Sequence, residues 1–151
     1  MALDDDIRLL SGVALFESLA DEHLRLLAFG AEKMSLRAGE TLYIEGEPAL
    51  CAYVVMSGRI EIYRERETEK IKLADAGPGT VLGELAVIAP TRRLSSAMAA
   101  VESRVMTIDR KSFRRILEEY PELPELIRRR LAREFQAMVE RLDALSSKLG
   151  E

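Results

Sequence analysis

The chain has 151 residues, of which 48% are hydrophobic and 32% charged, which is the composition of a globular protein with one core. Its formal net charge of −4 gives no overall positive field for a nucleic-acid backbone, so we expect no direct nucleic-acid binding. No apolar run approaches the roughly 18 residues of a membrane span, and Asp4, Asp5 and Asp6 stand where a signal peptide would be basic, which predicts a cytoplasmic protein without membrane contacts.

The predicted elements begin with two short helices within residues 11–31. An apolar cluster precedes two acids that suit the first turn of a helix: Leu15, Phe16 and Leu19, then Asp21 and Glu22. His23 falls on the polar side of the second helical pattern, which predicts an exposed histidine.

Residues 33–109 form one β unit, because short β-type runs separated by glycines follow one another at intervals of about ten residues. The predicted strands are Thr41–Ile44, Cys51–Met56, Arg59–Tyr63, Lys70–Leu73 and Arg104–Ile108. This spacing indicates an antiparallel sandwich or barrel, with Ser57 and Gly58 as a tight hairpin turn. Cys51, the single cysteine, is predicted to be a buried structural thiol.

Residues 110–151 are predicted to be helical, with a short helix over Lys111–Glu119 and a long one after the prolines at 121 and 124. In the long helix, apolar residues recur with the two-in-seven rhythm of a coiled coil: Leu131, Phe135, Met138, Leu142, Leu145 and Leu149. Such a stripe favours a homodimer through residues 124–149, although it could instead pack back on the β unit. The chain is thus interpreted as one domain, residues 1–151, that is mainly β with N-terminal helices (1–32) and C-terminal helices (110–151).

The reactive residues are few. One cysteine and one histidine exclude obvious Cys-His catalysis and Cys-rich zinc sites, and a Ser-His-Asp triad would need His23 as its base. No segment brings a nucleophile, a base and an acid together, so we expect no enzyme and no required cofactor.

Residues 77–97 carry the most chemistry. Gly83 allows backbone to approach a ligand, and Glu84, Leu85 and Ala86 can open a helical turn whose N–H groups bind an anion. An arginine ten residues after Gly83, followed by Ser95 and Ser96, would complete a phosphate site. Because a carboxylate repels phosphate, Glu84 implies a ligand that also offers hydroxyl donors, such as a sugar phosphate or a nucleotide.

Several short motifs occur in an order and spacing that resemble a known family. They are Leu15-Phe16 with Leu19, Arg37-Ala38-Gly39-Glu40-Thr41-Leu42, Glu45-Gly46-Glu47-Pro48, Tyr53-Val54-Val55-Met56-Ser57-Gly58, Gly77-Pro78-Gly79 and Gly83-Glu84-Leu85-Ala86. The chain resembles the cyclic nucleotide-binding domain of catabolite activator protein-like regulators, cyclic-nucleotide-regulated kinases and gated ion channels. The resemblance implies a double-stranded antiparallel, jelly-roll-like β-roll that holds cAMP or cGMP, and a long C-terminal helix that caps the base or forms the dimer.

The resemblance also implies a role for each residue of the site. Glu84 would accept the ribose 2′-hydroxyl, and Gly83, Leu85 and Ala86 would offer backbone groups. Arg93 would pair with the cyclic phosphate, with Ser95 and Ser96 in the place of the family's small and hydroxyl residues. Leu94 stands where a small residue is usual, and a shift of one residue would make Arg92 the phosphate partner instead.

Two functions remain open at this point. The first is a sensor of a cyclic nucleotide that signals through the C-terminal helix to a second copy or an unknown protein. For this sensor cAMP is favoured over cGMP, because Leu94 replaces the hydroxyl beside the arginine. The second is a domain that binds no nucleotide, in which Glu84 and Arg93 pair with each other and the long helix dimerises. A transcription factor of the catabolite activator type is disfavoured by length, unless the sequence is a fragment of a larger regulator.

Overall fold

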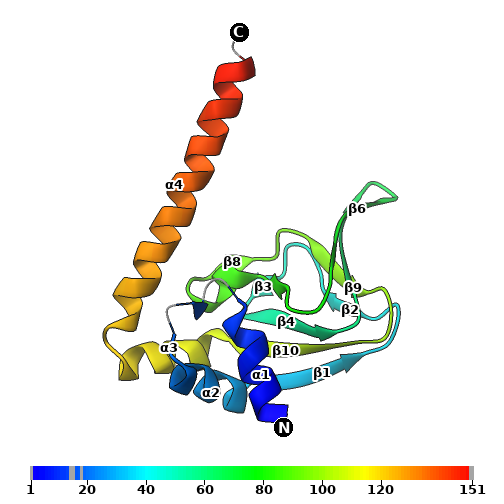
Figure 1. The fold of residues 1–151 in the computed structure, drawn as a ribbon. Helices are drawn as coiled ribbons and strands as arrows, with labels where there is room; N and C mark the ends of the chain where they lie inside the picture. Colours follow the sequence, from blue (N-terminus) through cyan, green and yellow to red (C-terminus); the bar gives the residue numbers. More distant parts are fainter. Residues whose placement is uncertain (1, 14–15, 18, 150–151) are drawn as a thin grey trace.

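Two four-stranded antiparallel sheets form the centre of the computed structural model, which describes residues 2–13, 16, 17 and 19–149 (Figure 1). The first sheet has the strand order β1-β10-β4-β7 and the second the order β2-β9-β5-β6, while β3 and β8 form a separate pair. The strands are β1 (Glu32–Leu36), β2 (Thr41–Tyr43), β3 (Pro48–Ala49), β4 (Cys51–Ser57), β5 (Ile60–Arg66), β6 (Glu69–Ala76), β7 (Val81–Leu82), β8 (Thr91–Arg92), β9 (Ser96–Ala99) and β10 (Ser103–Asp109). The prediction of a mainly antiparallel β fold with flanking helices is confirmed.

The helices contribute to one hydrophobic core on a face of the first sheet (Figure 1). They are α1 (Ala2–Ser11), α2 (Asp21–Gly30), the short 3-10 helix η2 (Glu84–Val87), α3 (Arg110–Glu119) and α4 (Leu123–Leu149). None of these helices, within the described part of the chain, is long and apolar enough to cross a membrane.

Strand β4 is buried on both faces, which explains its continuous apolar sequence. Because side chains alternate along a strand, Ala52 and Val54 face the helices and pack with Phe16, Phe113 and other helical residues. Val55 faces the other way and packs between the two sheets, in a second core with Leu36, Ile60, Ala76, Leu82, Ala97, Ala99 and Val105. The first sheet therefore separates a helical core from the interior of the roll. Cys51, at the start of β4, is buried as predicted.

The predicted hairpin at Ser57 and Gly58 is wrong. Strands β4 and β5 belong to different sheets, so this turn carries the chain from one sheet to the other. Gly58 has a φ of +87°, and a Cβ there would collide with the Ser103 side chain and with the backbone at Glu102. The local turn signal was correct, but the pairing partners of the two strands depend on the whole sheet arrangement.

The N-terminal region differs from its prediction in two respects. Helix α1 was not predicted, and the expected helix around Leu15 and Phe16 falls partly on residues 14, 15 and 18, which lie outside the described part of the chain. The expectation of an exposed His23 is also wrong, because only 6% of its surface is accessible. Its Nδ1 accepts a 3.0 Å hydrogen bond from the backbone N–H of Ala20, and its ring packs edge-on against Tyr120. His23, the third residue of α2, thus satisfies the backbone N–H of the N-cap residue Ala20.

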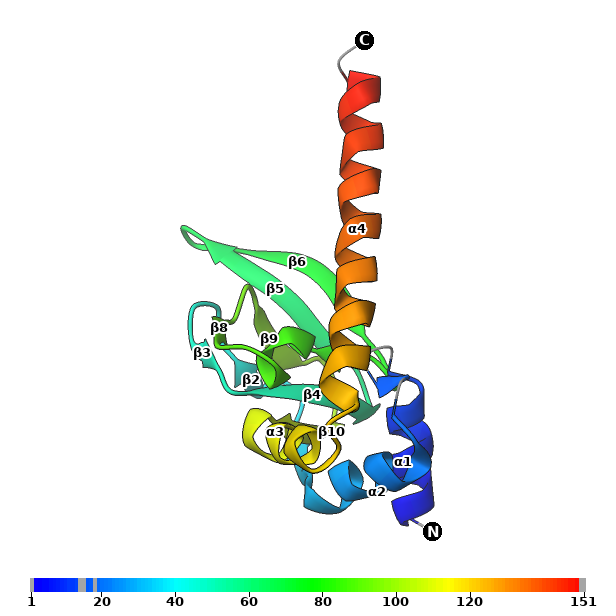
Figure 2. The same cartoon turned by 90° about the vertical axis from the view of Figure 1, so that its left-hand side faces the viewer.

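The C-terminal helices agree closely with the sequence. Asp109 caps α3 by accepting a 2.8 Å hydrogen bond from the Ser112 N–H. Pro121 lies between the helices, and Pro124 lies in the first turn of α4, where a missing N–H costs nothing. In both Figure 1 and Figure 2 the C-terminal half of α4 extends clear of the strands.

The apolar stripe of α4 changes its environment along the helix. Leu131 packs against the helical core, whereas Phe135, Met138 and Leu142 are 66%, 51% and 58% exposed. The side chains of Leu145 and Leu149 lie outside what the structure describes. Among the described members of the stripe, those beyond Leu131 thus do not pack back on the β strands.

We expect Gly58→Ala to destabilise the protein by at least ~2 kcal/mol, because strain at positive φ adds to a collision with Ser103. Gly39→Ala is the matched control, since Gly39 has a φ of +90° but no atom within 4 Å of a built Cβ, and we expect it to cost about 1 kcal/mol. Urea unfolding of both variants measures the difference. If Gly58→Ala and Gly39→Ala lose the same stability, the expectation is wrong, because the collision with Ser103 then adds nothing to the free energy of unfolding.

Candidate functional site

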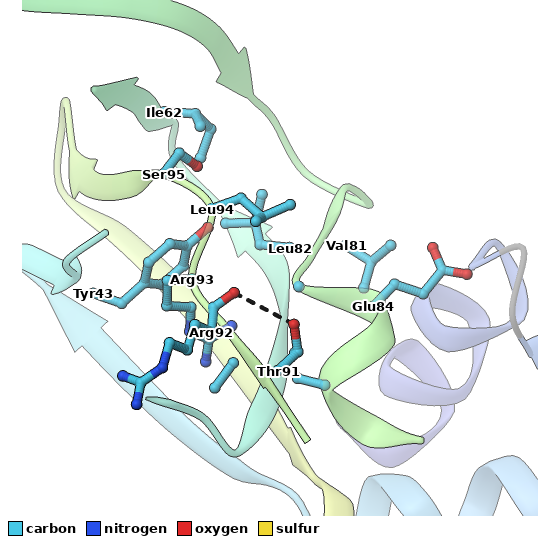
Figure 3. A pocket seen from close by; sticks show the side chains of 13 residues that line it. Tyr43, Ile62, Val81, Leu82, Glu84, Thr91, Arg92, Arg93, Leu94 and Ser95 are labelled. Atoms are coloured by element: carbon cyan, nitrogen blue, oxygen red, sulfur yellow. Dashed lines mark hydrogen bonds between the residues drawn. The ribbon is translucent and has the colours of Figure 1, made fainter. Parts of the chain in front are cut away.

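A cavity of about 350 Å³ opens inside the roll, beside the segment that the sequence singled out (Figure 3). Its walls come from β2, β5, β7, η2 and the segment around β8, so it lies where the two sheets and the short helix meet. The residues that line it are Tyr43, Ala49, Ile62, Val81, Leu82, Gly83, Glu84, Ala86, Thr91, Arg92, Arg93, Leu94 and Ser95. Six of the eight candidate residues from the sequence are among them; Ser96 is not, and the side chain of Leu85 lies outside what the structure describes.

Arg93 is the buried cation of this cavity, with only 7% of its surface accessible. Its backbone pairs with the loop before β3, because its N–H donates to Glu47 and its carbonyl accepts from Gly46, both at 2.8 Å. Its guanidinium Nη2 donates to the carbonyl of Cys51 at 2.9 Å and lies 3.6 Å from the Cys51 Sγ. The side chain is therefore fixed at the floor of the cavity.

The other terminal nitrogen of Arg93, Nη1, has no hydrogen-bond partner among the described residues, although it is buried. It lies against Gly83, where a Cβ would collide with it. No ion pair in the described part of the chain joins Arg93 to an acidic side chain. A buried guanidinium with an unused donor is costly unless an anion completes it, so this geometry favours an anionic ligand beside Gly83.

Arg92 lies on the opposite side of the same extended segment, as expected from the alternation of side chains along a strand. Its side chain is exposed and its Nη1 donates to the carbonyl of Gly46 at 2.8 Å. Figure 3 shows its guanidinium pointing away from that of Arg93. Of the two arginines that the sequence left open, Arg93 is the one whose charge is buried at the cavity.

Gly83 and η2 form one edge of the cavity. Gly83 has a φ of +72°, and its carbonyl accepts a 3.0 Å hydrogen bond from the Ala86 N–H, which closes the first turn of η2. Leu85 lies in this turn, while Ala86 is buried and lines the cavity. Figure 3 shows the Glu84 carboxylate turned away from Arg93, so the two side chains do not face each other across the cavity.

The residues after Arg93 divide between inside and outside. Leu94 is 76% exposed at the cavity rim, so its bulk does not fill the space beside Arg93. Ser95 lines the cavity. Ser96 is buried on the other side of β9, where its hydroxyl accepts a 2.9 Å hydrogen bond from the Glu45 N–H. In the structure Ser96 thus supports the loop before β3 rather than lining the cavity.

Two tyrosines that the sequence analysis did not select complete the surroundings of Arg93. Its guanidinium carbon lies 4.4 Å from the ring centre of Tyr43 and 5.3 Å from that of Tyr53. Burial raises the pKa of Tyr43, although the charge of Arg93 and a hydrogen bond with Ser95 oppose this shift. Burial, together with the neighbouring Cys51, raises the pKa of Tyr53 to about 12. Their alternation with core residues in β2 and β4 was the available sequence signal.

A second cavity, of about 550 Å³, lies near the outer side of β9 and is less suited to an anion. It is lined by Thr41, Ile44, Glu45, Gly46, Tyr63, Glu65 and Ser96, which include two carboxylates and no cation. Among the described residues no group of three or more His, Cys, Asp or Glu is placed to hold a metal ion. The cavity at Arg93 is therefore the candidate site.

The raised pKa of Tyr53 predicts a loss of stability at alkaline pH. An unfolded tyrosine ionises near pH ~10, so the unfolded chain releases this proton first as the pH rises. The stabilisation is fully present below pH ~10 and is lost as the pH approaches ~12. Tyrosinate absorbance should show a late phase that is smaller in Tyr53→Phe, since Tyr43 also ionises late, and the urea midpoint of that variant should fall less steeply with pH. A late phase of unchanged size in Tyr53→Phe would contradict the assignment.

Comparisons with known proteins agree with this fold. The family described as "Cyclic nucleotide-binding domain" matches residues 33–120. The chain is 29% identical over 126 residues to a CRP-like cAMP-activated global transcriptional regulator of Mycobacterium tuberculosis, which covers 83% of this chain and 56% of the relative. The chain thus spans about half the length of that curated relative.

Solved structures of related proteins have the same fold. A cyclic nucleotide-binding-like protein from Brucella abortus is 52% identical, covers 76% of this chain and 99% of its own, and has a TM-score of 0.73. The N-terminal domain of a transcriptional regulator from Streptomyces coelicolor is 27% identical, covers 89% of this chain and 94% of its own, and has a TM-score of 0.82. This chain belongs to the cyclic nucleotide-binding domain family.

Proposed function

We propose that this domain is a sensor that binds a cyclic nucleotide, cAMP in preference to cGMP, in the cavity at Arg93. The observation that carries the proposal is the buried guanidinium of Arg93, whose Nη1 has no partner among the described residues. A cyclic phosphate is a monoanion, and one charge-assisted contact to it would satisfy this donor. The cavity volume of about 350 Å³ is within the ~300–1,000 Å³ typical of small-molecule sites.

The other candidate residues would contact the remainder of the ligand. Gly83, Leu85 and Ala86 would offer backbone groups beside the phosphate. Glu84 would accept the ribose 2′-hydroxyl after a side-chain rotation, because its carboxylate points away from the cavity here (Figure 3). Ser95 would add a hydroxyl, while Ser96 would act indirectly through the loop at Glu45. The apolar residues Ile62, Val81 and Leu94 would face the base.

Preference for cAMP rests on two observations. Leu94, and not a hydroxyl residue, follows Arg93, so the site offers no side-chain donor or acceptor directly beside the phosphate arginine. The Mycobacterium tuberculosis relative is named as cAMP-activated. We infer that the response then passes through α4, since η2 contributes Ala86 to the cavity and Val87 to the same helical core as Leu123 and Ile127.

Titration calorimetry of cAMP and cGMP tests the proposal. Arg93→Ala should weaken cAMP binding about 10- to 150-fold, because it removes a charge-assisted contact of roughly 1.5–3 kcal/mol. Arg92→Ala is the matched control and should change affinity less than about threefold, since its side chain is exposed and its guanidinium already donates to the Gly46 carbonyl. No heat with either nucleotide at millimolar concentration would refute the function, and a reversed order of the two variants would assign the phosphate to Arg92.

A second candidate function is a homodimerisation module built on residues 124–149, with or without a nucleotide. Its supporting observation is the exposed stripe of Phe135, Met138 and Leu142 on α4. Large apolar side chains exposed in one line are typical of an interface with another helix. The occupant would be the same stripe of a second copy, or an unknown protein partner.

Sedimentation velocity tests this dimer. Phe135→Glu should weaken self-association about 10-fold or more, because it puts a charge at the most exposed residue of the stripe. Gln136→Glu, on a neighbouring face of the same helix, should leave the dimer intact. A wild-type chain that sediments as a monomer at tens of micromolar, with and without cAMP, would refute the dimer.

A further inference from the structure

We propose that Tyr43 and Tyr53 are positioning residues that hold the Arg93 guanidinium at the cavity floor by their ring faces, without neutralising its charge. The proposal rests on the proposed function, because the anion that would use this charge is the cyclic phosphate. Neither tyrosine was a candidate site residue in the sequence, although Tyr53 begins one of the family motifs, and both come from strands outside the segment 77–97.

The geometry brings three separate parts of the chain to one point. Tyr43 lies on β2 of the second sheet and Tyr53 on β4 of the first, and their rings are nearly parallel at 14° with centres 6.0 Å apart. The guanidinium carbon of Arg93 lies 4.4 Å and 5.3 Å from the two ring centres. Both distances are within the ~6 Å range of a cation–π interaction.

The aromatic faces hold the guanidinium without pairing its charge, which a carboxylate could not do. An acid beside Arg93 would satisfy Nη1, form a neutral pair and compete with an incoming phosphate. The ring faces attract the cation through their quadrupoles but accept no conventional hydrogen bond, so they fix its position and leave Nη1 unused. The carbonyl of Cys51, which holds Nη2, is likewise uncharged.

The state of the tyrosines supports this arrangement. Burial raises the pKa of both phenols, so neither forms an anion beside Arg93 at neutral pH. Tyr43 also lines the cavity together with Ser95, which places its hydroxyl within reach of a ligand. The ring and the hydroxyl of Tyr43 are therefore separable, since phenylalanine retains the first and removes the second.

The first test is calorimetric titration of the full chain with cAMP. Tyr43→Leu should weaken binding about 5- to 30-fold, and Tyr43→Phe should remain within about threefold of wild type because it keeps the ring face. Tyr63→Leu is the matched control: Tyr63 holds Lys70 by the same kind of contact, 4.8 Å from its ring centre, and does not line this cavity. A Tyr43→Phe variant that loses as much affinity as Tyr43→Leu would overturn the proposal, because the hydroxyl would then be responsible.

The second test needs no nucleotide. Tyr43→Leu, Arg93→Met and the double variant form a double-mutant cycle, measured by urea unfolding. The double variant should be less destabilised than the sum of the two single substitutions predicts, by a factor of about 2 to 30 in the equilibrium constant of unfolding. Tyr53→Leu in place of Tyr43→Leu gives a second cycle if the first variant fails to fold. If the stability effects of the single substitutions are additive in the cycle that can be measured, the proposal is overturned, whatever the affinities for cAMP. Coupling without any cyclic nucleotide binding by the wild type would refute the proposed function alone.

Discussion

The interaction on which the site depends is the burial of a guanidinium without an acidic partner. Arg93 is held by a backbone carbonyl, by two aromatic faces and by its own backbone pairing with the loop at Gly46 and Glu47. Each of these contacts orients the group and none removes its charge. The contacts within the chain offset only part of the free energy that it costs to bury this charge. An anion bound beside Gly83 would therefore have the most favourable electrostatic interaction with the protein.

The rest of the fold supplies these contacts from separate elements. Strand β4 provides the Cys51 carbonyl and Tyr53 on the cavity side, while Ala52 and Val54 on its other face pack with the helices. Likewise, η2 contributes Ala86 to the cavity and Val87 to the helical core that holds the base of α4. The site and the base of the long helix therefore share η2 and one hydrophobic core, which also contains Leu123 and Ile127.

Much of this was predictable from local sequence signals, and the failures share a cause. The strands and the loop at Gly83 followed from alternation, glycine spacing and motif order. His23 was placed on the surface because its helix pattern is polar there, yet Tyr120, almost a hundred positions later in the chain, covers it. The turn at Gly58 was recognised, but its strands pair with β6, β7, β9 and β10 rather than with each other. Both errors concern contacts between distant segments, which periodicity does not encode.

The sequence by itself determined the antiparallel β fold with its flanking helices, the segment that carries the site, and the apolar stripe of α4, because each depends on neighbours within a few residues. Only the tertiary structure decided which arginine is buried, because Arg92 and Arg93 differ by one position of an extended strand whose inner face is set by the surrounding sheets. It alone brought Tyr43 and Tyr53 together, since the two come from opposite sheets and meet at Arg93 only when the roll closes.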